Sequence, residues 1–527
     1  MHVTGFVGGK IYLSFKPLKV VDGLLVYGGR VLYAGPRDAV AILAKSLGGN
    51  LVDLHGKTVI PGFIDAHLHL DSLGLSLLTL DLRGVGSIEE LKGKLKEYAT
   101  TAKTKWILGH GWDHELFKER RWPTRWDIDE VVPDKPVLLT RACLHAGVLN
   151  TSALELTGLS KSHVNGVLRD SSGNPTGIVV EEALKIAREK VKGMLGFKDY
   201  LELVKVAQKH LLSQGITTVG FVSCGLTPLK ALLELWRSGE LNIRVRVYLN
   251  PVNGGVDVVS VLRNLGVKAG FGDDRLKIMG VKLFLDGALG ARTAWLSEPY
   301  SDDPQTSGYP VMDLKKLEEF AKLVDEAGLQ LAVHAIGDKA VKEALNVLRE
   351  LPGTRKLRHR VEHVSLIKDD DLKLMAELGA TAVVQPHFVI SDWWAMNRLG
   401  RKRVRWLYRF KSLIDTGIPT SFSTDAPVEP VNPWETVYAA VTRGRYENVP
   451  FYEDTIQESL NTIEALHAYT YGSAYVMHDE RELGSLEQGK FADLLVIDRD
   501  PLSTPERELR YIRVLEVYVG GARVWPK

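Results

Sequence analysis

The chain has 527 residues, of which 45% are hydrophobic and 25% charged, the composition of an ordinary globular protein and not of a disordered or membrane-embedded one. Its 67 Lys and Arg residues nearly balance its 65 Asp and Glu residues, so we expect no field that would attract nucleic acid or an anionic membrane. No apolar stretch approaches the roughly 20 residues that cross a bilayer. Two cysteines, Cys143 and Cys224, are too few for a disulfide framework, which makes a reducing cytoplasm the expected compartment.

Short alternating segments near both ends of the chain predict strands separated by Gly-rich turns. They lie at 10–15, 24–27, 30–34 and 50–54 near the N-terminus, and at 492–497 and 514–519 near the C-terminus. Neither end is long enough to bury a core alone. We therefore expect residues 1–61 and 481–527 to form one discontinuous β-sandwich domain.

Between these ends, eight short apolar segments alternate with amphipathic segments of helical periodicity. The predicted strands are 59–67, 216–222, 243–249, 276–285, 329–336, 359–366, 380–385 and 419–424. Eight parallel βα units favour an α/β fold with a closed (β/α)8 TIM barrel, spanning residues 62–480, over an open doubly wound sheet.

The gap between the first two predicted barrel strands is too long for a simple connection. We expect residues 82–198 to form an α/β insertion, rich in tryptophan, after the first barrel strand. A basic run at 401–411 is expected to be a solvated helix face and not a nucleic-acid site.

Two histidines lie two residues apart where the first predicted barrel strand ends, His67 and His69 in GFIDAHLHLD. Side chains two apart on a strand point to the same side, so both imidazoles can reach one metal ion. Barrel active sites are built at the C-terminal ends of the strands. We therefore favour metal ligands over a structural pair of histidines.

Three further candidates follow other predicted strands: His334 in LAVHAIGD, His363 in RVEHVSL and Asp425 in SFSTDAP. Each alone has a structural explanation, as a core histidine or a loop-starting carboxylate. Together they are harder to dismiss, because a barrel brings distant strand ends around one axis. Imidazole and carboxylate ligands suit zinc and its neighbours.

Lys282 lies inside the apolar strand IMGVKLFLDGALG, where an unpaired ammonium group would be costly. One solution is an ion pair with Asp286. The other is reaction of the neutral amine with carbon dioxide to give a carbamate that bridges two metal ions. The residues by themselves favour the ion pair.

The HLH pair, the strand-four lysine, the two later histidines and the final aspartate resemble the metal site of the amidohydrolase superfamily. The segments DGALGARTAWLSEPYSD, HAIGDKAV, RVEHVSLI and STDAPV resemble more narrowly the amidohydrolase-3 branch, which includes N-substituted formamide deformylases. RACLHAGVLNTSALELTGL and GSLEQGKFADLLVIDRDP share this likeness, which covers nearly the whole chain.

The resemblance implies a site for two Zn2+ ions, although the superfamily also has members with one ion and other divalent metals are open. His67 and His69 would hold the first ion with Asp425. Carboxylated Lys282 would bridge the ions, and the second would take the remaining two ligands, His334 and His363. Asp425 would also be the catalytic residue, taking a proton from the attacking water and passing it to the leaving nitrogen.

Several other residues have both a functional and a structural interpretation. Asp65 and Glu362 flank predicted ligands and are placed to orient them. Substrate contacts are expected, with packing as the alternative, for Trp112, His145, Arg292 and Trp394.

These observations predict a metal-dependent hydrolase that cleaves a non-peptide C–N bond, of the amide or N-substituted formamide type, in a small-molecule substrate. A cyclic amidase or a deaminase would use the same site. A non-catalytic regulatory or binding protein on the same barrel is the alternative from another class. The oligomeric state, including a homo-oligomer, stays open.

Overall fold

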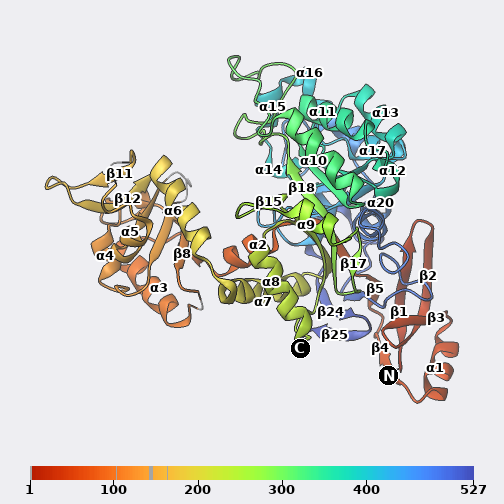
Figure 1. Cartoon of the computed structure of the whole chain (residues 1–527). Helices are drawn as coiled ribbons and strands as arrows, with labels where there is room; N and C mark the ends of the chain where they lie inside the picture. The colour runs from red at the N-terminus through yellow and green to blue at the C-terminus, as the bar shows by residue number, and fades with distance from the viewer. Residues whose placement is uncertain (1–2, 103, 142–145, 163, 527) are drawn as a thin grey trace. The chain divides into compact units, whose positions relative to one another are not determined.

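The computed structural model describes residues 3–102, 104–141, 146–162 and 164–526 (Figure 1). The chain forms two compact units, one of Met1–Leu70 with Gln208–Lys527 and the other of Asp71–Ala207. The first contains the terminal strands and the barrel.

Both ends of the chain contribute to one eight-stranded sheet in the first unit. Its order is β25–β24–β23–β5–β1–β2–β3, and β4 pairs with β1. The strands are β1 (Val3–Phe15), β2 (Leu18–Tyr27), β3 (Arg30–Gly35), β4 (Asn50–Asp53), β5 (Thr58–Pro61), β23 (Leu494–Ile497), β24 (Val514–Val519) and β25 (Ala522–Trp525). The two ends meet where β23 pairs antiparallel with β5, and they share a core that includes Phe6, Val59 and Leu494. Helix α1 (Arg37–Ser46) packs on this sheet through Val40 and Ala44.

The eight predicted barrel strands are all present and parallel, which confirms the fold class. Their order is β6–β13–β14–β18–β19–β20–β21–β22. They are β6 (Phe63–Leu68), β13 (Ile216–Cys224), β14 (Arg244–Leu249), β18 (Leu276–Phe284), β19 (Gln330–Ala335), β20 (Arg360–His363), β21 (Thr381–Val384) and β22 (Thr420–Phe422). The barrel closes through the backbone just after β22, because Asp425 N–H donates to His67 O (2.9 Å) and His69 N–H to Ala426 O (2.9 Å).

The first predicted barrel strand, 59–67, is two strands in the structure. β5 belongs to the terminal sheet and β6 opens the barrel. The chain changes sheets at Gly62, where a Cβ would lie 2.4 Å from Thr217 Oγ1. Both strands are fully buried, so the apolar pattern continues across the break and hides it.

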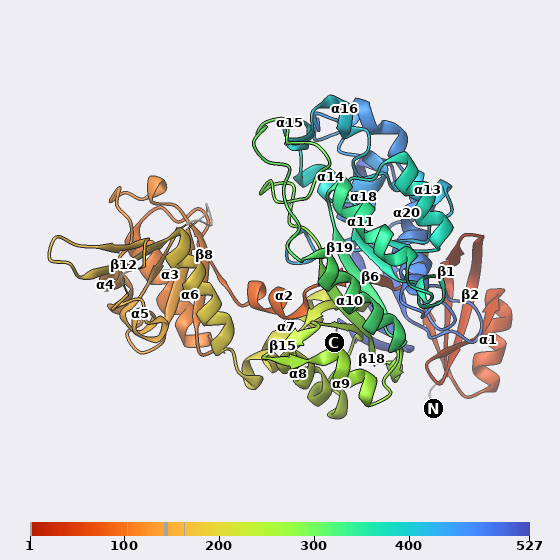
Figure 2. The same ribbon diagram turned by 45° about the horizontal axis from the view of Figure 1, so that its top comes forward.

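Helices cover the outside of the barrel, as α10 and α11 show beside β18 and β19 (Figure 2). α10 illustrates why they form: the Asp313 carboxylate caps its first turn by accepting from Lys315 N–H (3.1 Å), and Leu317, Ala321 and Val324 form its buried stripe. The helices of this unit that follow the insertion are α8 (Leu226–Arg237), α9 (Val258–Asn264), α10 (Leu314–Glu326), α11 (Asp338–Arg349), α12 (Thr354–Leu357), α13 (Asp369–Leu378), α14 (Phe388–Ser391), α15 (Ala395–Leu399), α16 (Arg401–Val404), α17 (Phe410–Asp415), α18 (Pro433–Thr442), α19 (Tyr452–Thr455), α20 (Thr462–His467) and α21 (Ser473–Val476).

The second unit has a six-stranded sheet of order β11–β12–β10–β9–β8–β7. Its strands are β7 (Leu80–Asp81), β8 (Ile107–Trp112), β9 (Val137–Arg141), β10 (Ala146–Leu149), β11 (Val167–Arg169) and β12 (Pro175–Val180). Its helices are α2 (Leu70–Leu77), α3 (Ile88–Thr101), α4 (Arg125–Asp129), α5 (Thr151–Thr157), α6 (Glu181–Met194) and the first part of α7 (Phe197–Ser213), which ends in the first unit. In the part of the chain that the structure describes, none of the helices has the length and apolarity to cross a membrane.

Candidate metal centre

The predicted ligands lie at the C-terminal ends of the barrel strands. One nitrogen of His67, one of His69 and one carboxylate oxygen of Asp425 lie within 4.8 Å of one another. The Nε2 atoms of both histidines are each 3.3 Å from Asp425 Oδ1. This spacing lets the three groups bind one ion together.

The orientation of His67 is set by its neighbours on β20. Its Nδ1 lies 2.5 Å from Glu362 Oε2, and Arg360 holds that carboxylate through two bonds of 2.7 and 2.8 Å. Because Nδ1–H is donated to the ionised Glu362 carboxylate, Nε2 is the nitrogen of a neutral His67 ring that is left to bind an ion beside Asp425. Asp425 Oδ1 is itself buried without a hydrogen-bond partner among the described residues. Two lone-pair atoms that converge in this way fit a cation between them.

The other two predicted histidines are also oriented by hydrogen bonds. His363 Nδ1 lies 2.8 Å from Gln385 Oε1, and His334 Nε2 lies 3.0 Å from the carbonyl oxygen of Gly287. The ring centroids of these histidines are 4.4 Å apart, and that of His363 is 5.0 Å from that of His67. Nε2 of His363 and Nδ1 of His334 therefore remain for a second ion.

Lys282 is 1% exposed, and its Nζ has no hydrogen-bond partner within the described part of the chain. The expected ion pair with Asp286 is wrong. The Asp286 carboxylate instead accepts backbone N–H groups of Trp295 (2.8 Å), Ile336 (3.0 Å) and Gly337 (2.8 Å), which fix the loop after β18. Burial lowers the pKa of Lys282 to about 8, although the negative charges of Glu362 and Asp425 act to raise it.

The protonation states of the cluster suit metal binding. Burial lowers the pKa of His334 to about 3 and that of His363 well below its usual value, so both rings are neutral. Burial alone would raise the pKa of Asp425, but His67 and His69 outweigh it and hold the pKa well below the usual range. Neutral imidazoles and an ionised carboxylate are the forms that bind cations.

The backbone at the site departs from ordinary strand geometry. The φ angles of His363 and Asp425 are +73° and +56°, which are uncommon for residues other than glycine and gather at functional sites. Asp65 joins the first and last strands, because it accepts hydrogen bonds from Thr424 Oγ1 (2.6 Å) and from the backbone N–H of His67 (3.1 Å). It therefore holds the backbone of His67, whereas Glu362 holds the ring.

The sequence did not single out a second polar cluster at the strand ends. His387 follows β21 and its Nδ1 bonds the Glu429 carboxylate, which also accepts from Ser391 Oγ (2.7 Å). Glu429 comes directly after a turn in which Val428 N–H donates to Asp425 O (2.9 Å). The histidine in QPHF after a predicted strand was the available signal, but its partner lies 42 residues away.

Two of the predicted substrate residues, Arg292 and Trp394, lie in one cluster. Asp302 binds both Arg292 (3.0 Å) and Arg398, and the Arg398 guanidinium lies 5.3 Å from the centre of a Trp394 ring. A Cβ at Gly290 would be 3.2 Å from the Trp394 ring, so the loop after β18 touches the indole. The loops that follow β18 and β21 are thus joined.

The other two predicted substrate residues belong to the second unit. Trp112 is fully buried in that unit's core, and its Nε1–H donates to Leu139 O (2.9 Å). Packing accounts for this position, and a substrate contact stays a prediction. His145 lies outside the described residues.

Comparison with known proteins identifies the family of the chain. A family model described as "Amidohydrolase family" matches residues 50–525. The chain is 31% identical to YtcJ of Bacillus subtilis over 99% of both chains, and 28% identical to the N-substituted formamide deformylase of Arthrobacter pascens over 95% of this chain and 94% of that protein. It also resembles the crystal structure of an uncharacterized metal-dependent hydrolase from Pyrococcus horikoshii, with a TM-score of 0.84 and 44% identity over 96% of this chain and 99% of the other.

Proposed function

The chain belongs to the amidohydrolase family and resembles a metal-dependent hydrolase of known structure, and we propose that it hydrolyses a non-peptide C–N bond in an amide or an N-substituted formamide. The observation that carries the proposal is Lys282, a buried amine without a hydrogen-bond partner in the described structure, at the end of the barrel where imidazoles and a carboxylate converge. A barrel that only bound a ligand would have no physical need for this costly group. The name of the deformylase relative supports the formamide class.

The residues present fit two divalent ions. We assign His67, His69 and Asp425 to the first ion, which we propose is zinc, and His334 and His363 to the second. Lys282 reacts as a free amine with carbon dioxide, forming an N–C bond and releasing a proton. The resulting carbamate would offer anionic oxygen ligands to the ions, in place of an ammonium that would repel them. When bound, the metal supplies Lewis-acid activation of water near neutral pH.

The chain's own groups complete the chemistry. Asp425, ionised and 7% exposed, accepts the proton of the attacking water and passes it to the leaving nitrogen. Glu362 and Gln385 keep His67 and His363 in the tautomers that leave one lone pair each for an ion.

The first test is metal content and turnover of the purified chain. We expect elemental analysis to find a transition metal, and the variant with both His67→Ala and His69→Ala to lose metal and activity together. The substrate panel contains N-benzylformamide, N-acyl amines, cyclic imides and aminopurines, and the expected substrates are the first two. Turnover of cyclic imides or aminopurines alone would instead favour a cyclic amidase or a deaminase. A metal-loaded chain that turns over none of them would support the non-catalytic alternative.

A further inference from the structure

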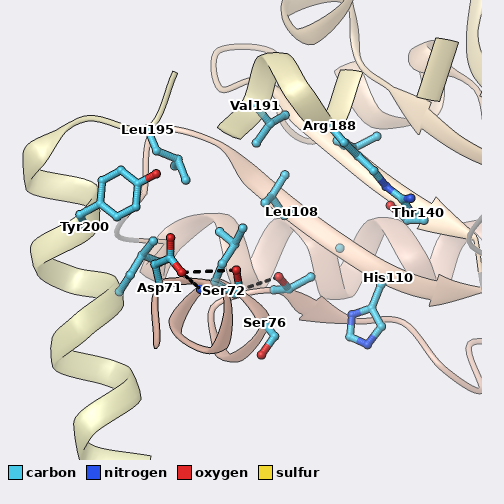
Figure 3. Close-up of a pocket in the computed structure, with 15 residues that line it drawn as sticks. Asp71, Ser72, Ser76, Leu108, His110, Thr140, Arg188, Val191, Leu195 and Tyr200 are labelled. Carbon is cyan, nitrogen blue, oxygen red and sulfur yellow. Dashed lines mark hydrogen bonds between the residues drawn. The ribbon is translucent and has the colours of Figure 1, made fainter. Parts of the chain in front are cut away.

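The second unit contains a cavity of about 420 Å3, and none of its lining residues is a candidate metal ligand (Figure 3). Helices α2, α6 and α7 and strands β8 and β9 supply its walls, and all of its lining residues belong to the second unit. Its volume is within the range of about 300–1,000 Å3 that is typical of small-molecule sites.

Most of the cavity wall is apolar. Leucines and a valine, one from each of these five elements, line it, namely Leu75, Leu108, Leu138, Val191 and Leu203, together with Leu195. The helices that form one side are packed tightly, because a Cβ at Gly74 of α2 would lie 2.2 Å from the carbonyl oxygen of Leu203 in α7. The wall therefore offers a preformed surface for an apolar chain or ring.

One end of the cavity is polar and carries a positive charge at its mouth, because Arg188 lines the cavity there and is exposed to solvent. Arg188 on α6 extends toward Thr140 of β9 (Figure 3). Burial lowers the pKa of Arg188, and no carboxylate or hydrogen bond in the described structure acts against that effect. On β8, His110 is paired in register with Thr140, and its buried Nδ1 lacks a hydrogen-bond partner among the described residues.

We propose that this cavity binds a small monocarboxylic acid with an apolar chain or ring. The carboxylate would pair with the Arg188 guanidinium, whose planar fork matches a carboxylate in two parallel hydrogen bonds. The ring nitrogen of His110 lies at the same end as a further hydrogen-bonding group. The apolar part of the acid would lie against the leucine wall, so that one ligand pairs with the guanidinium at the mouth and buries apolar surface inside.

The opposite wall limits the class of ligand. Asp71 on α2 lines the cavity, and its Oδ1 accepts a hydrogen bond from Ser72 N–H (2.8 Å). Its negative charge disfavours a second carboxylate at that end, so a dicarboxylate should bind less well than a monocarboxylate of the same length. An amine could form an ion pair with the Asp71 carboxylate but would leave Arg188 without a counterion.

The test is isothermal titration of the full-length, metal-loaded protein with octanoate, and with octanol, octylamine and octanedioate as comparisons. Octanoate is expected to bind best. Arg188→Gln should weaken octanoate about tenfold or more, since a hydrogen bond to a charged group is lost. The control Lys185→Gln removes a positive charge from an exposed residue of the same helix that does not line the cavity, and it should leave the affinity unchanged. Leu75→Trp should abolish binding by filling the cavity.

Binding at the metal centre is a separate outcome that the variants distinguish. Octanoate held there would survive Arg188→Gln and would be lost in the variant with both His67→Ala and His69→Ala. That pattern would overturn the proposal, as would equal affinity for octanoate and octylamine. The proposal is supported when octanoate binding depends on Arg188 and not on the two histidines, whatever the enzyme's substrate is.

Discussion

Lys282 gives the strongest residue-scale argument for a bound group, because its amine is buried without a hydrogen-bond partner among the described residues. Its position in an apolar strand was visible in the sequence, but the sequence alone favoured an ion pair with Asp286. That preference failed because backbone N–H groups of two segments, Trp295 in the loop after β18 and Ile336 and Gly337 just after β19, occupy the Asp286 oxygens. A strand pattern shows which residue is buried but not which groups fold back on it.

We expect Lys282→Ala to lose the bridging carbamate and with it more activity than the roughly 10- to 100-fold that is typical of residues that only orient a metal ligand. Short carboxylic acids such as propionate should restore part of the rate by occupying the bridging position. Turnover and metal content measure this, and 13C NMR of wild type in labelled bicarbonate detects the carbamate. Exposed Lys268→Ala is the control. Full activity of Lys282→Ala without additive would remove the carbamate from the mechanism.

Gln385 gives a second residue-scale prediction because its Oε1 accepts the hydrogen bond from His363 Nδ1. Gln385→Leu removes that acceptor, and metal affinity should fall by about 10- to 100-fold, mainly for the second ion. Gln385→Glu keeps an acceptor oxygen and should retain most of the affinity. Titration in a metal buffer measures both variants. If Gln385→Leu held two ions as tightly as wild type, His363 would not need this partner.

The site illustrates what residue patterns can and cannot predict. HLH and the strand-end residues His334, His363 and Asp425 follow from the period of a strand and the closure of a barrel. The choice of ring nitrogen does not, because it depends on partners such as Glu362, which is 295 residues from His67. The His387–Glu429 pair was missed for the same reason.

At the scale of elements, the sequence predicted all eight barrel strands because their apolar runs are short and repeated. It merged β5 with β6, since burial of both strands leaves no polar residue at Gly62 to mark the change of sheet. It also gave no sign that the loops after β18 and β21 are tied together. The tie is Asp302, which binds one arginine from each loop, Arg292 and Arg398.

This tie leads to a prediction about specificity. Trp394→Ala should change the ratio of kcat/KM between bulky and small substrates by about 1–3 kcal/mol, the usual contribution of pocket contacts. Asp302→Asn should shift the ratio in the same direction, because it weakens the hold of Arg398 on the indole. The exposed neighbour provides a control, Trp393→Ala. Steady-state kinetics on an N-benzyl and an N-methyl amide would test this, and an equal loss on both would point to folding or catalysis instead.

At the scale of the whole first unit, buried ion pairs join the barrel to the segments that follow it. Arg244 of β14 binds Asp493, just before β23 of the terminal sheet, at 2.7 and 2.9 Å. Its neighbour on the same strand, Arg246, binds Asp479, which also accepts from Lys277 Nζ (2.6 Å) of β18. Strands β14 and β18 of the barrel therefore supply the positive charges of these ion pairs, and the C-terminal part of the chain supplies the carboxylates. We call this group of ion pairs the seam. Such a seam cannot be predicted from apolar patterning, because these arginines interrupt apolar runs.

Asp479 makes the seam testable. Burial alone would raise its pKa, but Arg246 and Lys277 outweigh burial and lower it below the usual 3.8. A lowered pKa in the folded state means that the ionised group stabilises the fold above pH 3.8, and that this stability is lost as the pH falls through the folded-state pKa.

Asp479→Asn leaves Arg246 buried without its counterion, so it should cost about 3–5 kcal/mol of folding stability near neutral pH. Wild type loses the stability of the ionised Asp479 at acid pH, whereas the variant has no carboxylate at this position to protonate. The difference in folding stability between the two proteins should therefore shrink as the pH falls below 3.8. Thermal unfolding at a fixed scan rate across pH measures the difference, and Asp38→Asn, at an exposed pair, should change little at any pH. A difference between Asp479→Asn and wild type that stayed constant down to the most acidic pH would show that the carboxylate's charge does not stabilise the seam.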